Sequence, residues 1–164
     1  DEIGQEEFEE LNKLLLHRAK LKAMSLLKYQ DRTKKELKER LMRAEFPEFI
    51  TEGAVAYVES FGYINDDAYI RNFIDSRKDK KSRREIYAIL RQKGVDMNRA
   101  EEIMEEMYEE HSDQEAIREL LRKKHWDFAC TDPKEKQKIY GYLVRKGFRY
   151  EDIRQVIQVC DWNA

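Results

Sequence analysis

Apolar residues recur along this chain at helical spacing, in three stretches that share one pattern. Each stretch has two aliphatic residues four positions apart, then a basic residue, a position suited to a helix end and another apolar residue. The stretches are Leu37–Phe46, Ile86–Val95 and Ile139–Phe148. Aliphatic residues four positions apart lie on one face of an α-helix. The pattern therefore predicts three amphipathic helices that end in the same way.

The predicted helix ends carry a glycine in two of the three stretches. Gly94 and Gly147 follow a lysine at the point where a left-handed residue commonly closes a helix, and the next apolar residue can then fold back on the last turn. Glu45 occupies that position in the first stretch. We expect a weaker cap there, because a side chain disfavours the left-handed conformation.

A further helix is predicted on each side of every stretch. Val55, Met104 and Ile157 fall at one offset after the three helix ends, and Val58, Met107 and Cys160 at another. Earlier helices are predicted over residues 18–29, 67–77 and 114–126. The copies are spaced by 49 and 53 residues, from Leu41 to Leu90 and from Leu90 to Leu143, which leaves only short connections. We predict an all-α fold of three tandem three-helix repeats in an elongated, curved array.

The repeats are predicted at residues 18–63, 64–111 and 112–164. Residues 1–17 contain six acidic residues and one basic residue and are predicted to form an acidic helical extension that could continue into the next helix. Residues that suit helix starts agree with these boundaries. They are Asn65 or Asp66, Ser82, Ser112 or Asp113, and Thr131 or Asp132 before Pro133.

The composition argues against several classes of protein. Charged residues make up 40% of the chain, while glycine and proline total eight, which favours solvated helices over turn-rich β structure. The two cysteines have no CxxC spacing, no apolar run approaches the roughly 20 residues that cross a bilayer, and the first ten residues are acidic. We expect a monomeric, cytoplasmic protein that does not enter a membrane.

Motifs of catalysis were sought and not found. The chain lacks GxxxxGK[ST], GxSxG and HExxH, and the adjacent Asp66 and Asp67 suit a helix start better than a metal or acid–base pair. The three histidines each lie near a helix end, Cys160 is expected to be buried, and the state of Cys130 stays open. We predict a protein that is not an enzyme and holds no cofactor or metal.

Basic residues cluster at the starts of the predicted second helices. The clusters contain Arg32, Lys34, Lys35 and Lys38; Arg77, Lys78, Lys80, Lys81, Arg83 and Arg84; and Lys134, Lys136 and Lys138. They suit an anionic partner, although simple solvation of a charge-rich chain explains them about as well. The aromatic residues Tyr57, Phe61, Tyr63, Tyr69 and Phe73 could stack on bases, but their helical spacing favours packing between repeats.

Two runs of sequence resemble a known family. Residues 59–77, ESFGYINDDAYIRNFIDSR, and residues 84–95, REIYAILRQKGV, resemble the central signature of the RecX family, and residues 23–37 resemble its first unit. The similarity spans about residues 18 to 160. Ile70 departs from the small alanine usual in the family, and Lys81-Ser82 replaces a common glycine.

The resemblance implies a non-enzymatic regulator that lies in the groove of the RecA filament on single-stranded DNA. Such a protein would inhibit or modulate the recombinase, ATPase and co-protease activities and so limit recombination and the SOS response. The alternatives are a direct nucleic-acid-binding helical-repeat protein and an α-solenoid scaffold for another protein. On this basis the expected contact residues are Lys34, Lys35, Lys38, Arg71, Arg77, Lys80, Lys81, Arg83 and Arg84.

Overall fold

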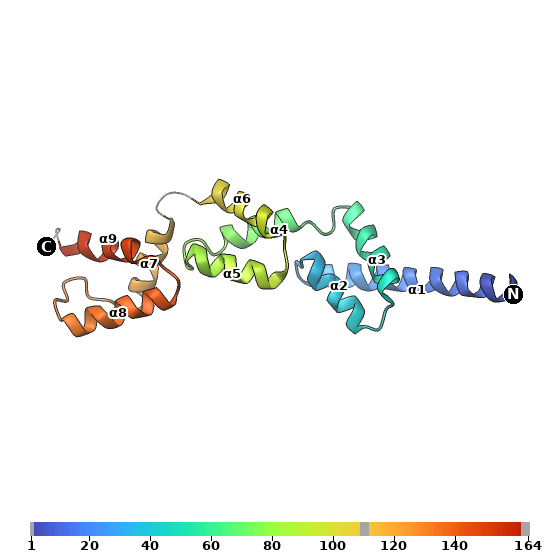
Figure 1. Cartoon of the computed structure of the whole chain (residues 1–164), viewed down its shortest axis with the longest axis horizontal. Coiled ribbons are helices and arrows are strands. Elements are labelled where there is room, and N and C mark those ends of the chain that lie inside the picture. Colours follow the sequence, from blue (N-terminus) through green and yellow to red (C-terminus); the bar gives the residue numbers. More distant parts are fainter. Residues whose placement is uncertain (1, 109–111, 162–164) are drawn as a thin grey trace. The chain divides into compact units, whose positions relative to one another are not determined.

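The computed structural model describes the backbone of residues 2–108 and 112–161 and the side chains of residues 4–108 and 113–157. Within these residues the chain forms nine α-helices and no strand. They are α1 (Glu2–Tyr29), α2 (Lys34–Arg43), α3 (Glu48–Ser60), α4 (Asp66–Asp75), α5 (Arg83–Lys93), α6 (Met97–Met107), α7 (Ser112–Lys123), α8 (Pro133–Arg145) and α9 (Tyr150–Asp161) (Figure 1). The all-α prediction is confirmed for the described part of the chain.

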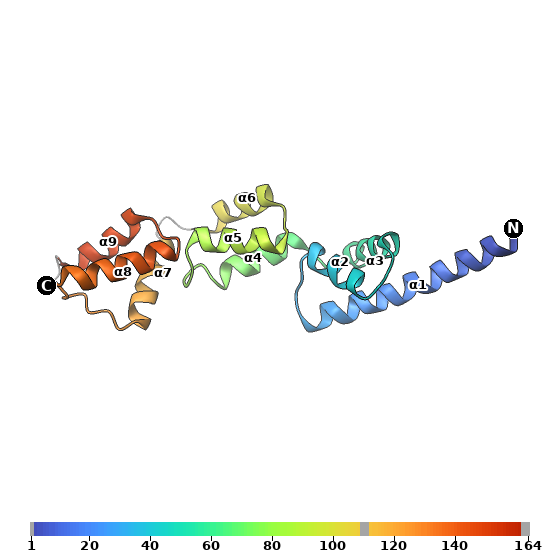
Figure 2. The ribbon, with the colours of Figure 1, turned by 60° about the horizontal axis from the view of Figure 1, so that its bottom comes forward.

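The helices group into two compact units. The first contains α1 to α3, the first residues of α4 and residues 93–96, and the second contains residues 70–92 and the chain from residue 97 onward. In the first unit, α1 packs against α3 and α2 (Figure 1). In the second unit, α9 packs against α7 and α8 (Figure 2). None of the described helices combines the length and apolar character needed to cross a membrane.

Each second helix buries the pair of aliphatic residues that revealed the repeat. Leu37 and Leu41 join the core of the first unit with Ala19, Ala23, Ile50 and Ala54. Ile139 and Leu143 join a core of the second unit with Ile117, Leu121 and Ile153. Ile86 and Leu90 are fully buried, as are Ile70, Ile74 and Ile103 of the flanking helices. Val55, Met104 and Ile157 are buried as predicted.

The three second helices also end in the same conformation. Glu45, Gly94 and Gly147 have φ angles of 65°, 73° and 94°, all in the left-handed region. In the first and third copies, the amide of the next residue closes the turn: Phe46 N–H donates to the Leu41 carbonyl at 3.3 Å, and Phe148 N–H to the Leu143 carbonyl at 3.2 Å. Glu45 therefore makes the same turn as the glycines, with the steric cost that its Cβ brings.

The acidic extension and the first helix of repeat one form the single helix α1, the continuation that the sequence allowed. Two helix ends differ from the predicted ones. Helix α4 ends at Asp75 and α7 at Lys123, both earlier than predicted. After α7, His125 takes a left-handed φ of 52° and Trp126 N–H donates to the Leu121 carbonyl at 3.0 Å. This is the same closing turn, but without a glycine to signal it in the sequence.

The predicted packing of the aromatic residues between repeats is wrong for two of them. Phe61 and Tyr63 are 59% and 56% exposed, whereas Phe73 is buried. Phe61 caps the end of α3, Gly62 turns the chain with a φ of 71°, and Ile64 takes the buried position after the turn. The rings of Phe61 and Tyr63 stack on each other, with centroids 5.9 Å apart, instead of entering the core.

Two predictions about cysteine and histidine fall outside the described side chains. These concern the burial of Cys160 and the surroundings of His111. Cys130 is a free, half-buried cysteine in the loop between α7 and α8.

Candidate partner-binding surfaces

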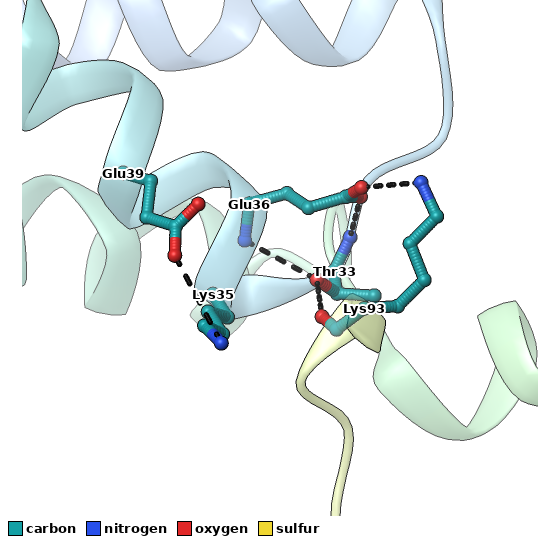
Figure 3. Close-up of polar contacts among 5 residues, drawn as sticks. All are labelled: Thr33, Lys35, Glu36, Glu39 and Lys93. Carbon is teal, nitrogen blue, oxygen red and sulfur yellow. Dashed lines mark hydrogen bonds and ion pairs between the residues drawn. The ribbon is translucent and has the colours of Figure 1, made fainter. Parts of the chain in front are cut away.

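The start of α2 is held by a buried threonine. Thr33 is fully buried, and its Oγ1 accepts a hydrogen bond from the Glu36 amide at 3.2 Å. The same hydroxyl donates to the Lys93 carbonyl at the end of α5, 2.8 Å away (Figure 3). The Lys34 amide, next along the helix, donates to Asp66 Oδ1 at 3.0 Å. Two distant segments are thus tied to the first turn of α2.

The second unit repeats this arrangement at the start of α5. Ser82 is fully buried, accepts from the Glu85 amide at 3.1 Å and donates to the Lys146 carbonyl at 2.8 Å. The Arg83 amide donates to Asp113 Oδ1 at 2.9 Å. We call each arrangement a cap joint: a buried hydroxyl caps a second helix and bonds the last carbonyl of a later one, while an aspartate accepts the adjacent amide.

The two aspartates of the cap joints have perturbed acidity. Burial raises the pKa of Asp66 above its usual value, and the hydrogen bond from the Lys34 amide only partly offsets this effect. Burial likewise raises the pKa of Asp113, which the Arg83 amide opposes. The helix-start interpretation predicted that Asp66 caps its own helix, but Asp66 accepts the Lys34 amide at the start of α2. The N-cap of α4 itself is Asn65, whose Oδ1 accepts from the Ala68 amide at 3.1 Å.

The start of α8 lacks both groups that donate hydrogen bonds in a cap joint, the buried hydroxyl and the backbone amide available to an aspartate. In the first two repeats the first buried aliphatic residue lies four positions after the capping hydroxyl, whereas Ile139 lies seven positions after the N-cap Asp132. The second helix of repeat three is therefore one turn longer at its start. Glu135 stands where the hydroxyl would be, and the following amide, that of Lys136, donates to the Asp132 carbonyl at 3.0 Å.

Each of the three predicted contact lysines near the start of α2 forms an ion pair. The pairs are Lys34 with Glu59 at 2.8 Å, Lys35 with Glu39 at 4.0 Å, and Lys38 with both Glu48 and Glu52 at 3.1 Å. Hydrogen bonds to Glu52 and Glu48 raise the pKa of Lys38 above its usual value. These pairs are solvent-exposed and contribute little to stability. They do lower the net positive charge that this surface offers to a partner.

The six predicted contact residues of the middle repeat fall into three groups. Arg71 pairs with Glu106 at 2.5 Å and Lys81 with Glu85 at 2.6 Å. The guanidinium carbon of Arg77 lies 3.9 Å from the centroid of the Phe73 ring, and that of Arg83 lies 5.7 Å from the centroid of the Tyr108 ring. Lys80 and Arg84 form no ion pair with any residue whose side chain is described. Their charge is thus the most available to a partner.

Arg84 lies between two grooves, and the sequence reasoning missed three of their basic residues, Arg145, Lys146 and Arg149. One groove, of about 510 Å³, is lined by Arg83, Arg84 and Arg149, together with the acids Glu101 and Asp113. The other, of about 580 Å³, is lined by Arg84, Arg145 and Lys146. The signal for these residues was present: they flank Gly147, as Lys93 flanks Gly94 in the preceding copy.

The residues with described side chains offer no cluster of three or more histidine, cysteine, aspartate or glutamate side chains placed to hold a metal ion. The polar groups of the two cap joints bond to backbone groups and to one another, as helix caps do. The arrangement therefore presents basic surfaces, and what it offers chemically is the binding of anionic groups.

The sequence of the chain matches family models and the sequences of known proteins. Residues 19–57 match the model of the first three-helix domain of RecX, and residues 112–157 match that of its third three-helix domain. The regulatory protein RecX of Amycolatopsis mediterranei is 32% identical over 134 residues, which cover 80% of this chain and 76% of the relative. The chain belongs to the RecX family. The RecX of Caldanaerobacter subterraneus is 29% identical over 160 residues, covering 96% of this chain and 79% of the relative.

Solved RecX structures share the fold. The crystal structure of RecX from Lactobacillus salivarius superposes with a TM-score of 0.71 at 25% identity and covers 90% of this chain and 97% of that one. A second crystal structure of a regulatory protein RecX gives a TM-score of 0.72 at 20% identity and covers 89% of this chain and 73% of that one. The prediction of tandem three-helix repeats is confirmed by the RecX domain models and these neighbours. The chain is a member of a family of regulatory proteins.

Proposed function

We propose that this RecX family member regulates the RecA recombinase by binding the RecA filament on single-stranded DNA. In this proposal it modulates the recombinase, ATPase and co-protease activities, acts in the cytoplasm as a monomer and performs no catalysis of its own. The repeat boundaries predicted at residues 17/18, 63/64 and 111/112 are part of the proposal. Membership of the RecX family supports it.

The observation that carries the proposed binding surface is the uneven pairing of the predicted basic residues. Lys34, Lys35 and Lys38 are already paired with glutamates, whereas Lys80 and Arg84 form no ion pair among the described residues. A cation that is already paired adds less to the field that attracts an anionic partner. We therefore assign the larger share of binding to the middle repeat.

The test is RecA-dependent, DNA-stimulated ATP hydrolysis with added protein. We expect the wild type to change the rate, and the double substitution Lys80→Glu and Arg84→Glu to reduce that effect by about tenfold in the concentration required, since each charge reversal introduces like-charge repulsion. The matched control reverses two paired lysines, Lys34→Glu and Lys38→Glu, and should have the smaller effect. An unchanged rate at excess wild-type protein would refute the proposal.

Direct binding to nucleic acid is the second candidate, because the same basic residues could contact phosphates. Fluorescence anisotropy on bare single- and double-stranded DNA across a salt series separates the two. Tight binding that weakens steeply with salt, and that added RecA does not strengthen, would favour a DNA-binding protein. Weak binding to bare DNA together with tight binding to the filament would favour the RecA proposal.

A further inference from the structure

A groove in the second unit combines unpaired cations with an apolar floor. It lies between α5 and the end of α8, has a volume of about 580 Å³, and is lined by Arg84, Ala88, Tyr142, Val144, Arg145 and Lys146. Val144 is half-exposed, at 50%, and Ala88 is also exposed. Arginine and tyrosine around an exposed aliphatic patch are the residue types on which tight protein contacts are usually built.

The charges in this groove are not balanced. Arg84 and Arg145 form no ion pair with a residue whose side chain is described. The ammonium groups of Lys124 and Lys146 lie 4.1 and 5.8 Å from the centroid of the Tyr142 ring. The acid that lines the groove, Glu85, is bonded to Lys81 at 2.6 Å. The groove is therefore electropositive.

The equivalent surface of the first unit is neutralised by its own residues. Lys35 and Glu39 occupy the positions of Arg84 and Ala88, and Figure 3 shows Lys35 directed toward Glu39, 4.0 Å away. Lys93, at the position of Lys146, pairs with Glu36 at 2.6 Å, and that hydrogen bond raises the pKa of Lys93. At the second joint both pairings are lost.

One difference in sequence and one difference in pairing account for this loss. Alanine at position 88 removes the acid that would face Arg84 from one helical turn away. Both units have a basic residue directly before the capping hydroxyl, Arg32 in the first and Lys81 in the second. Lys81 bonds the carboxylate of Glu85, whereas the equivalent Glu36 pairs with Lys93. The second cap joint therefore has the same backbone frame as the first but leaves its cations available.

We propose that the groove between α5 and the end of α8 docks a short acidic segment of a protein partner, with its carboxylates on Arg84 and Arg145 and an apolar side chain on Ala88 and Val144. The exposed aliphatic side chains of the groove cannot form a favourable contact with the charged phosphates of a nucleic acid. The Tyr142 ring already carries two ammonium groups, so it is poorly placed to stack a base. Both observations favour an acidic protein segment over nucleic acid.

This inference rests on the proposed function for the identity of the partner: within the RecA filament, the groove would contact the recombinase and not its DNA. The test is therefore built on Ala88→Glu, which introduces the acid that the first unit has at Glu39. Residue 88 is exposed on a helix, and glutamate is a good helix former, so the fold should be retained. Ala88→Gln is the matched control, with the same bulk and no charge.

Binding is measured by anisotropy to two probes: the RecA filament on single-stranded DNA, and a labelled synthetic peptide of alternating glutamate and leucine. We expect Ala88→Glu to weaken both by about tenfold, and Ala88→Gln to weaken both by only about threefold, because it disturbs the apolar contact without adding a charge. Glu39→Ala, which changes only the first unit, should not weaken either. Binding of bare single-stranded DNA should fall less than binding of the peptide.

The outcomes separate the inference from the proposed function. If the wild type binds the filament and Ala88→Glu binds it equally well, the groove is not the docking site, although the regulator proposal stands. If the wild type ignores the filament but binds the peptide in a manner that Ala88→Glu abolishes, the groove inference stands and the RecA proposal fails. If neither probe binds, or if bare DNA is affected more than the peptide, the inference is overturned.

Discussion

Replacing Thr33 by valine tests whether the cap joint stabilises the first unit. Valine keeps the branched shape of the buried side chain but removes the hydroxyl, which accepts from the Glu36 amide and donates to the Lys93 carbonyl. Loss of an N-cap costs about 1 kcal/mol. Leaving the Lys93 carbonyl without its donor costs about 1 kcal/mol more. We expect Thr33→Val to lower the free energy of unfolding by about 2 kcal/mol.

The assay is urea and thermal denaturation followed by circular dichroism, together with hydrogen exchange of individual amides. The first unit contains about 70 residues. If it unfolds by itself, a loss of this size lowers its melting temperature by about 8–16 °C, whereas unfolding of the whole chain in one step gives about 4–8 °C. The Glu36 amide should lose protection in either case, because the hydroxyl is its acceptor.

Thr33→Ser is the control, since serine retains the hydroxyl and changes only the methyl group. The reasoning is refuted if Thr33→Val and Thr33→Ser unfold within about 0.5 kcal/mol of each other, which is the range of a neutral surface substitution. It is also refuted if exchange at the Glu36 amide does not change.

Three further predictions follow from the helix ends, the buried aspartates and the start of α8. Gly147→Ala should destabilise the protein by about 1 kcal/mol more than Gly62→Ala in urea denaturation. Both glycines have a positive φ, but of the two only Gly147 has a neighbour that an added Cβ would meet, Ser82 Oγ at 2.9 Å. Burial raises the pKa of Asp66, so the Asp66 carboxylate is protonated at a higher pH in the folded protein than in the unfolded chain. The wild type should therefore gain stability relative to Asp66→Asn as the pH falls from 7 to about 4. A loss of stability over that range would contradict the raised pKa of Asp66. A fourth repeat made by duplicating residues 64–111 in tandem should show full amide protection. One made by duplicating residues 112–164 after residue 164 should exchange as a separate unit, because the start of α8 has no donors for a cap joint.

The features of the fold that could be predicted are those set by neighbours in sequence. Aliphatic residues four apart, such as Leu37 and Leu41, share a helix face whatever surrounds them, and both are fully buried. The left-handed turns at Gly94 and Gly147 follow from their lack of a Cβ. The helix ends at Glu45 and His125 have the same left-handed geometry, but glutamate and histidine do not predict it from the sequence. The residues that follow these two turns, Phe46 and Trp126, pack against the cores of their units.

The candidate surface was less predictable, because net charge depends on partners that are distant in sequence. Lys34 meets Glu59, 25 residues away, and Lys93 meets Glu36, 57 residues away. A cluster of basic residues in the sequence therefore did not reveal which cations stay unpaired. The exposure of Phe61 and Tyr63 was missed for a different reason: the turn at Gly62 directs Ile64 into the core in their place.

The sequence by itself determined the helices, their order and the recurrence of one three-helix pattern, because periodicity and turn chemistry act within a few residues. Only the tertiary structure decided that a buried hydroxyl joins the start of one second helix to the end of a later one. It also decided that Lys35 and Lys93 are paired at the first joint, whereas Arg84 and Arg145 form no ion pair with a described side chain at the second. Hydrogen bonds and ion pairs between segments tens of residues apart depend on how cores pack, and that packing leaves no local signal in the chain.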